Sequence, residues 1–209
     1  MNISELQNEF DRQSQNLLQK GYPEIGGLSA ESFKVHIEPL RKNLEEIKEI
    51  PDGHIPFVIV VKQLLIPAEK ALPLIQLGNT TGSVNMYPHK PEDFTTIEEV
   101  TIPDASVYLL VDIDTGQQTL NVTPHDALST IQKQNRSPLT IDEGVAIVTH
   151  FPEVLVDKEH YNSFSMLASR RGDQRVPALW ISYGKPRLGW CWNNNPHTWL
   201  GSASCRNRI

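Results

Sequence analysis

Cysteine is scarce in this sequence, and long apolar runs are absent. The 209 residues contain two cysteines, Cys191 and Cys205. So few cysteines exclude a disulfide-rich secreted scaffold, and we expect two free thiols in a reducing compartment. Apolar runs such as Phe57–Val61 are far shorter than the roughly 18 residues that a membrane span needs, and the N-terminal stretch MNISELQNEF is acidic where a secretory signal would be basic and then apolar. The sequence therefore predicts a cytoplasmic protein without a membrane segment.

The common catalytic signatures are also missing. There is no phosphate loop of the G-x-x-x-x-G-K-[ST] type, no G-x-G-x-x-G after a strand, no H-E-x-x-H and no G-x-S-x-G. These absences argue against the common nucleotide enzymes, the zincins and the α/β-hydrolases. One tetrad, Ser182-Tyr183-Gly184-Lys185, matches S-x-x-K, but a strand and a turn carry it where that chemistry needs the serine at a helix start.

Composition and charge are those of a globular protein with an uneven charge distribution. Hydrophobic residues make up 39% of the chain and charged residues 21%, which is enough apolar surface for a core. The formal net charge is -6, yet residues 170–209 carry +6 and the rest of the chain -12. A basic segment on an acidic protein either neutralises its surroundings or binds an anion. The cationic residues of this segment are Arg170, Arg171, Arg175, Lys185, Arg187, Arg206 and Arg208, against Asp173 alone.

The pattern of caps and apolar residues predicts an α+β fold. Residues 1–50 are expected to be helical, with a capping box at Ser4 and Gln7 and a second helix that Ser29 caps and Pro39 interrupts. Residues 62–103 are rich in Pro, Gly and Asn and predict no clear element. The remaining expected elements are strands at Phe57–Val61, Val107–Asp114 and Thr119–Val122, helices capped by Thr123 and by the Thr140–Glu143 pair, and strands Val176–Tyr183 and Leu188–Trp192 joined by a turn at 184–187.

These elements predict a single domain over residues 1–209, with a helical N-terminal part (1–50) and a mixed α/β part (51–209). We expect the N-terminal helices to pack on a mainly antiparallel sheet around a single core. We also expect a monomer or a weak dimer.

The segment 176–205 concentrates the residue types from which binding sites are made. All four tryptophans of the chain lie in it, together with Cys191, His197 and a run of three asparagines. Period-two alternation places Trp190 and Trp192 on one face of their strand and Cys191 on the other. Aromatic walls with a few polar groups form small-molecule sites, although tryptophans also fill cores and asparagines also build turns.

Four stretches carry a resemblance to a known family. They are GYPEIGGLS, LNVTPHDAL, PLTIDEGVAIVTHFP and RVPALWISYGKPRLGWCWNNNPHTWLGSASC. Together they resemble a bacterial family of unknown function, over nearly the whole chain. The resemblance implies a bacterial protein of this length and a shared role for the C-terminal motif, but no activity.

Our first hypothesis is a binding protein for a small anionic or flat ligand, such as a nucleotide or a sugar phosphate. Arginine forks beside aromatic faces suit such ligands. Single-stranded nucleic acid uses similar groups, but an acidic chain with one basic segment makes nucleic acid the weaker alternative. The residues expected to bind are Arg175, Trp180, Arg187, Trp190, Trp192, Asn193, Asn195, His197 and Trp199.

Two other classes of function remain open. In an enzyme, Cys191 would be the nucleophile and His197 its base, because a reactive thiol needs a nearby imidazole or positive charge. In an interaction subunit, the same aromatic patch would contact another protein. No metal is expected. The set Cys191, His197 and Cys205 lacks the spacing of known metal ligands, and so does the turn after Asp112. No other cofactor can be named from the sequence.

Overall fold

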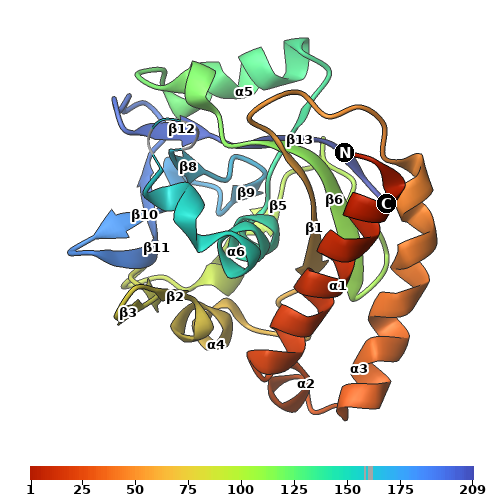
Figure 1. Cartoon of the computed structure of the whole chain (residues 1–209). Coiled ribbons are helices and arrows are strands. Elements are labelled where there is room, and N and C mark those ends of the chain that lie inside the picture. Colours follow the sequence, from red (N-terminus) through yellow and green to blue (C-terminus); the bar gives the residue numbers. More distant parts are fainter. Residues whose placement is uncertain (158, 160–161) are drawn as a thin grey trace.

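The fold has a central helix that lies between two larger sheets (Figure 1). The computed structural model describes residues 1–157, 159 and 162–209. The expected α+β class, with N-terminal helices and mainly antiparallel pairing, is confirmed. The α-helices are α1 (Ile3–Gln19), α2 (Tyr22–Ile25), α3 (Ala30–Ile37), α4 (Ala68–Ala71), α5 (Pro124–Lys133) and α6 (Ile141–His150). The 3-10 helices are η1 (Glu38–Glu46), η2 (Leu72–Leu74), η3 (Pro91–Asp93), η4 (Gln117–Thr119) and η5 (Pro152–Leu155).

The two larger sheets join segments that lie far apart in the sequence. In the first, β1 (Ile55–Val61), β6 (Val107–Asp114), β13 (Ser204–Arg208) and β7 (Ser137–Pro138) follow one another in space, and all pairs are antiparallel. The second has the order β12 (Leu200–Ser202), β8 (Ser163–Ser165), β10 (Arg175–Ser182), β11 (Lys185–Trp192) and β4 (Ser83–Val84). Here β10 is antiparallel to both β8 and β11. The two edge strands pair in parallel with their neighbours, β12 with β8 and β4 with β11. Short pairs join β2 (Gln76–Leu77) to β3 (Thr80–Thr81) and β5 (Thr95–Thr96) to β9 (Ser169–Arg170).

Helix α6 lies between the two sheets and is buried on nearly all sides. Its sequence IDEGVAIVTH is apolar around most of its circumference, as expected for a helix inside a core. It packs against β1 on one side, and on the other Gly144 approaches Met166 and Leu179 so closely that a Cβ at this position would lie 2.0 Å from the Met166 sulfur. A glycine is therefore required where α6 meets the second sheet.

Side chains cover the backbone of β1, which is the edge strand of the first sheet. The amide of Gln13 in α1 donates to the Phe57 carbonyl and accepts from the Ile59 N–H, at 2.9 and 2.8 Å. His150 at the end of α6 lies 3.2 Å from the Ile59 carbonyl through Nε2. An open edge strand invites pairing with other chains, so these bonds both satisfy and protect it.

Most of the expected helix starts are confirmed, and the first is wrong by two residues. Ser29 and Thr123 cap α3 and α5, and Thr140 forms a capping box with Glu143 at α6. At α1 the capping box consists of Asn2 and Glu5, while Ser4 lies inside the helix. Asparagine is among the strongest N-cap residues and comes earlier in the chain, so the helix begins there.

Two details of the expected strands are also corrected. Thr119 ends η4 instead of beginning a returning strand, and its hydroxyl donates to the Gly116 carbonyl. The place beside β6 belongs to β13, the last strand of the sequence. In the β10–β11 hairpin the turn is Tyr183-Gly184, not 184–187; both residues have positive φ, 50° and 73°, which suits the twist of a two-residue hairpin.

Candidate functional site

The β10–β11 hairpin separates the expected binding residues into two groups on opposite faces. The register pairs Arg175 with Trp192 and Pro177 with Trp190, so these residues share one face. Trp180 pairs with Arg187, which places both on the other face together with Cys191. The four tryptophans therefore do not line a common surface.

On the first face, Arg175 lies against two indole rings. Its guanidinium carbon is 4.6 Å from the Trp190 ring centroid and 5.0 Å from that of Trp192. The two rings meet edge to face at 5.1 Å, and Trp190 donates from Nε1 to the Met86 carbonyl at 3.4 Å. Trp192 keeps 42% of its surface exposed, so it is not a core residue. This arrangement fixes the plane of the Arg175 fork at the open end of the hairpin.

One carboxylate serves two arginines beside these rings. Asp173 accepts from Arg171 at 2.7 Å and from Arg175 at 2.8 Å through the same oxygen. Burial acts to raise the pKa of Asp173, but the Arg175 backbone N–H and the two guanidinium charges hold it below its ordinary value. Arg171 also lies 3.0 Å from Nε2 of His89. Arg171, Asp173, Arg175, Trp190 and Trp192 form what we call the arginine–indole cluster.

Several guanidinium nitrogens in this region are buried and lack an acceptor among the described residues. They include Nε of Arg171, Nε of Arg175 and Nη1 of Arg170. Arg170 donates from Nη2 to the Asn193 side chain at 3.3 Å, and no described carboxylate pairs with it. Burial lowers the pKa of Arg170, which reflects the cost of holding its charge there. Unpaired buried donors of this kind call for an anion or for ordered water.

The second face holds the other aromatic group. The Trp180 and Trp199 rings lie 6.5 Å apart, and His197 lies 5.0 Å from Trp199. Trp180 covers Gly189 so closely that a Cβ there would lie 2.3 Å from the indole. Nε of Arg187 on this face is also buried without an acceptor among the described residues. His197, Trp199 and Trp180 are therefore separated from Arg175 and Trp192 by the sheet.

The two expected asparagines have backbone roles at the end of the hairpin. Asn193 donates its N–H to Gln174 and accepts from the His125 N–H at the start of α5. Asn195 donates its N–H to the Trp192 carbonyl and is exposed. The side chain of Asn193 accepts from Arg170, which is not part of the arginine–indole cluster.

Cys191 has a setting that does not favour nucleophilic chemistry. Its sulfur has a hydrogen-bond partner in the Ser165 hydroxyl, at 3.9 Å, whereas the His197 ring lies against Trp199. Burial raises the pKa of Cys191, more than the Ser165 hydroxyl and the Arg170 charge lower it. Cys205 is fully buried in β13, and burial raises its pKa to about 12. Within residues 1–157, 159 and 162–209 no three His, Cys, Asp or Glu side chains form a group suited to a metal ion.

A second charged cluster lies in the first sheet and has a structural explanation. The Asp112 carboxylate is fully buried, with His54 Nδ1 at 2.5 Å, Arg206 Nε at 2.7 Å and Arg136 Nη1 at 3.3 Å. Burial would raise the pKa of Asp112, but the His54 and Arg136 interactions hold it below its ordinary value. Asp112 also has a φ of 55°, a conformation that needs support from its surroundings. The cluster connects the turn before β1, strand β6 and strand β13.

Sequence reasoning did not assign Arg171 and Asp173 of the arginine–indole cluster, or His89 beside it. Arg171 and Asp173 appear in the charge count of residues 170–209 but not among the expected binding residues. His89, next to Arg171, lies in the stretch 62–103, where the sequence predicts no element. The charge imbalance was the signal that could have identified the first two.

No helix in the part of the chain that the structure describes is long and apolar enough to cross a membrane.

Comparison with known proteins assigns the chain to a family whose function is unknown. No curated protein and no solved structure matches the chain. A family model described as "Family of unknown function (DUF5701)" matches residues 16–209, in agreement with the resemblance of the sequence motifs. The chain therefore belongs to this family of unknown function.

Proposed function

We propose that the protein binds a small anionic ligand, such as a nucleotide or a sugar phosphate, at the arginine–indole cluster. One observation carries the proposal: Arg171 and Arg175 share the single carboxylate of Asp173, and each retains a buried Nε without an acceptor among the described residues. Buried charged donors are costly to leave unpaired. An incoming phosphate or carboxylate would satisfy them.

The surroundings of the arginines favour a small ligand. The indoles of Trp190 and Trp192 hold Arg175 in one orientation before a ligand arrives, which lowers the entropy that binding must overcome. Arg171 and Arg175 of the cluster lie together at the base of the hairpin, whereas a nucleic-acid backbone needs a longer basic groove.

The geometry supports binding better than the thiol chemistry considered above. A nucleophilic Cys191 would need its base within hydrogen-bond reach, yet its sulfur lies against the Ser165 hydroxyl. The raised pKa of Cys191 also keeps the thiol protonated at neutral pH.

Isothermal titration with inorganic phosphate, ribose 5-phosphate and adenosine monophosphate tests the proposal. We expect at least one of them to bind saturably. Arg171→Gln should weaken that binding by about 1.5–3 kcal/mol, or about ten- to a hundredfold, through loss of a charged hydrogen bond. Arg175→Lys keeps the charge but loses the flat fork, and should weaken binding as well.

Lys185→Gln is the matched control, because it removes one positive charge from the exposed tip of the same hairpin. It should leave the affinity within about twofold. If none of the three compounds binds, or if Lys185→Gln weakens binding as much as Arg171→Gln, the proposal is wrong.

A further inference from the structure

A polar hollow of about 200 Å³ lies where β1 ends and α6 begins. Lys62 and Gln63 follow β1 directly, and Asp142 is in the first turn of α6. Thr140 caps that helix, and Ser169 accepts the Ile141 N–H through its hydroxyl oxygen at 3.0 Å. Phe94, Thr96, Ile102 and Ile141 complete the lining. Nothing in the hairpin site uses this hollow.

Two residues that line the hollow each have a buried acceptor oxygen without a hydrogen bond among the described residues. These oxygens are Oε1 of Gln63 and Oδ1 of Asp142. The two residues come from different elements and line the same hollow. Two buried acceptors at one place require a group that brings hydrogen-bond donors.

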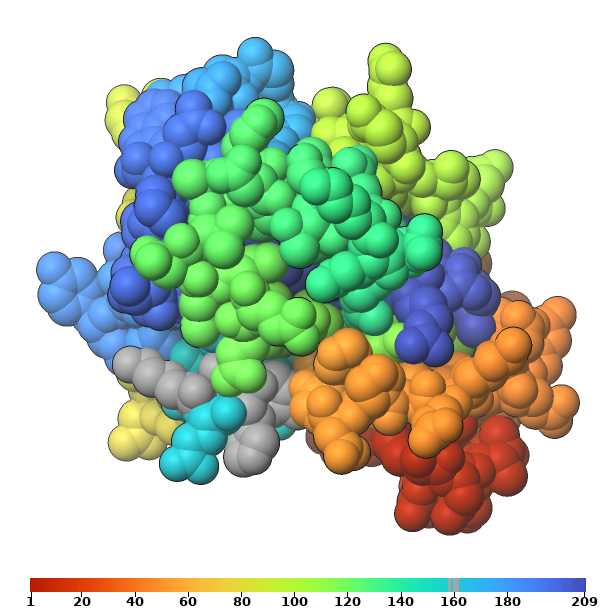
Figure 2. Space-filling model, turned by 90° about the horizontal axis from the view of Figure 1, so that it is seen from above, coloured from red at the N-terminus to blue at the C-terminus, as the bar shows by residue number. Residues whose placement is uncertain are grey.

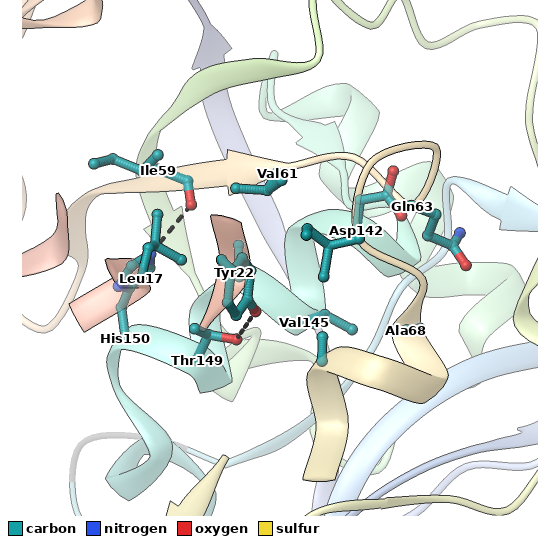
Figure 3. A pocket seen from close by; sticks show the side chains of 13 residues that line it. Leu17, Tyr22, Ile59, Val61, Gln63, Ala68, Asp142, Val145, Thr149 and His150 are labelled. Atoms are coloured by element: carbon teal, nitrogen blue, oxygen red, sulfur yellow. Dashed lines mark hydrogen bonds between the residues drawn. The ribbon is translucent and has the colours of Figure 1, made fainter. Parts of the chain in front are cut away.

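The enclosed pocket that Gln63 and Asp142 also line is too small for a ligand that carries an ammonium group. It has a volume of about 10 Å³, enough for about one water molecule. Figure 3 shows Asp142 and Gln63 at one end of this pocket and His150 at the other. The remaining polar groups already have partners: Tyr22 bonds to Thr149, and His150 bonds to the Ile59 carbonyl. The outer hollow is therefore where a larger donor can enter.

The charge of Asp142 identifies the kind of donor. Burial raises the pKa of Asp142 to about 6, with the neighbouring Glu143 also raising it, while Gln63 and Lys62 act in the opposite direction. The carboxylate is thus largely ionised at neutral pH, and it forms no ion pair among the described residues. Lys62 is near enough to lower the pKa of Asp142, but its ammonium donates to the Pro103 carbonyl. An ammonium group of a ligand would offer three donors and a positive charge in direct contact.

The rest of the hollow carries the opposite polarity. The Lys62 ammonium has donors beyond the one used on Pro103, and the hydroxyls of Thr140 and Ser169 lie in the same lining. We propose that this hollow binds a small zwitterion of the amino-acid class, with its ammonium on Asp142 and Gln63 and its carboxylate on Lys62. The hollow has room for a compound of a few heavy atoms, so glycine and L-alanine are the first candidates.

NMR spectroscopy of the full-length protein tests this inference. The probes are glycine and L-alanine, with ethylamine and propionate as half-ligands that carry one charge each. We expect both amino acids to shift the Gln63 side-chain amide and the Ser169 backbone amide saturably. Each half-ligand should bind at least about tenfold more weakly, because it satisfies one end of the hollow.

Variants decide whether the response comes from this site. Asp142→Asn should lower the affinity for L-alanine by about tenfold or more, whereas Asp52→Asn, in an exposed turn, should not change it. Asp142→Asn removes a destabilising buried charge, so the variant is expected to fold. Arg175→Lys should leave the L-alanine response intact, which separates this test from that of the hairpin site.

Three results would overturn the inference. The first is that neither amino acid gives a saturable shift in the wild-type protein at millimolar concentrations. The second is an unchanged affinity in Asp142→Asn. The third is that propionate or ethylamine binds as tightly as L-alanine.

Discussion

Replacing Asp142 by asparagine should make the protein more stable at neutral pH. The pKa of this carboxyl rises from 3.8 to about 6 in the folded protein, chiefly through burial. A difference of about two units corresponds to about 3 kcal/mol, at roughly 1.36 kcal/mol per unit. Because the folded state holds the proton to higher pH than the unfolded state, stability falls as the pH rises from about 4 to about 6, and then stays low. The substitution removes this loss, and the new amide N–H can donate to Gln63.

Urea unfolding of the wild type and of Asp142→Asn, at pH values from about 4 to about 8, measures the effect. We expect the two proteins to differ little near pH 4, and the variant to be more stable by up to about 3 kcal/mol above about pH 7. Taking the difference between the proteins removes contributions that both share. One of these is His150, whose pKa burial lowers to about 3, so that its contribution is lost as the pH falls below about 6.5.

Asp52→Asn is the control, as its side chain is exposed and the same charge is removed. It should show no comparable gain. A lower stability of Asp142→Asn than of the wild type at neutral pH, or a difference that does not depend on pH, would contradict this prediction.

Four further predictions concern the hairpin and the core. Trp192→Ala should weaken ligand binding by about 1–3 kcal/mol in calorimetric titrations and reduce the free energy of unfolding by less, since the side chain is 42% exposed; a larger loss of stability than of affinity would identify Trp192 as a core residue. Cys191 should resist iodoacetamide at neutral pH until urea unfolds the protein, because burial raises its pKa; mass spectrometry showing rapid labelling of the folded protein would contradict this. Arg208→Ala should lower the free energy of unfolding by about 3–5 kcal/mol, because it leaves the buried Glu143 carboxylate without its cation; a loss below about 1 kcal/mol would count against it. Scanning calorimetry should show one unfolding transition, and two separated transitions would contradict the single core expected for residues 1–209.

The elements that the sequence predicted well are those whose signals are local. Phe57–Val61 and Val107–Asp114 are apolar runs that form β1 and β6, and Thr140 with Glu143 caps α6 as expected. Strand β13 was not predicted, because SCRNR contains one apolar residue among polar and charged ones. It lies inside the first sheet since Cys205 is buried and Arg208 pairs with Glu143 and Ser137. Such tertiary partners are not visible in a local pattern.

The binding residues were predicted as a set, but their division between two faces was not. Residues that pair across the hairpin share a face, and any turn with an even number of residues pairs even-numbered positions with odd-numbered ones. Trp180 and Trp190 are both even-numbered and lie on different strands, so they must point to opposite faces. The expected turn at 184–187 and the observed turn at 183–184 both satisfy that condition. The faces could therefore have been inferred, whereas the neighbours could not: the four-residue turn would pair Trp180 with Cys191, and the observed turn pairs it with Arg187.

Both candidate sites contain groups that oppose folding when nothing is bound. At the hairpin, the Nε atoms of Arg171 and Arg175 are buried without acceptors among the described residues, and at the hollow the same holds for Gln63 and Asp142. A protein selected for stability alone would pair such groups or replace them with apolar residues. Replacing buried charged groups with well-packed apolar residues is often neutral or stabilising. Their presence is explained if a ligand supplies the missing partner, because a ligand that binds only the folded state stabilises that state. The two sites have opposite needs, acceptors for the arginines and donors for Asp142, so a single kind of ion cannot satisfy both.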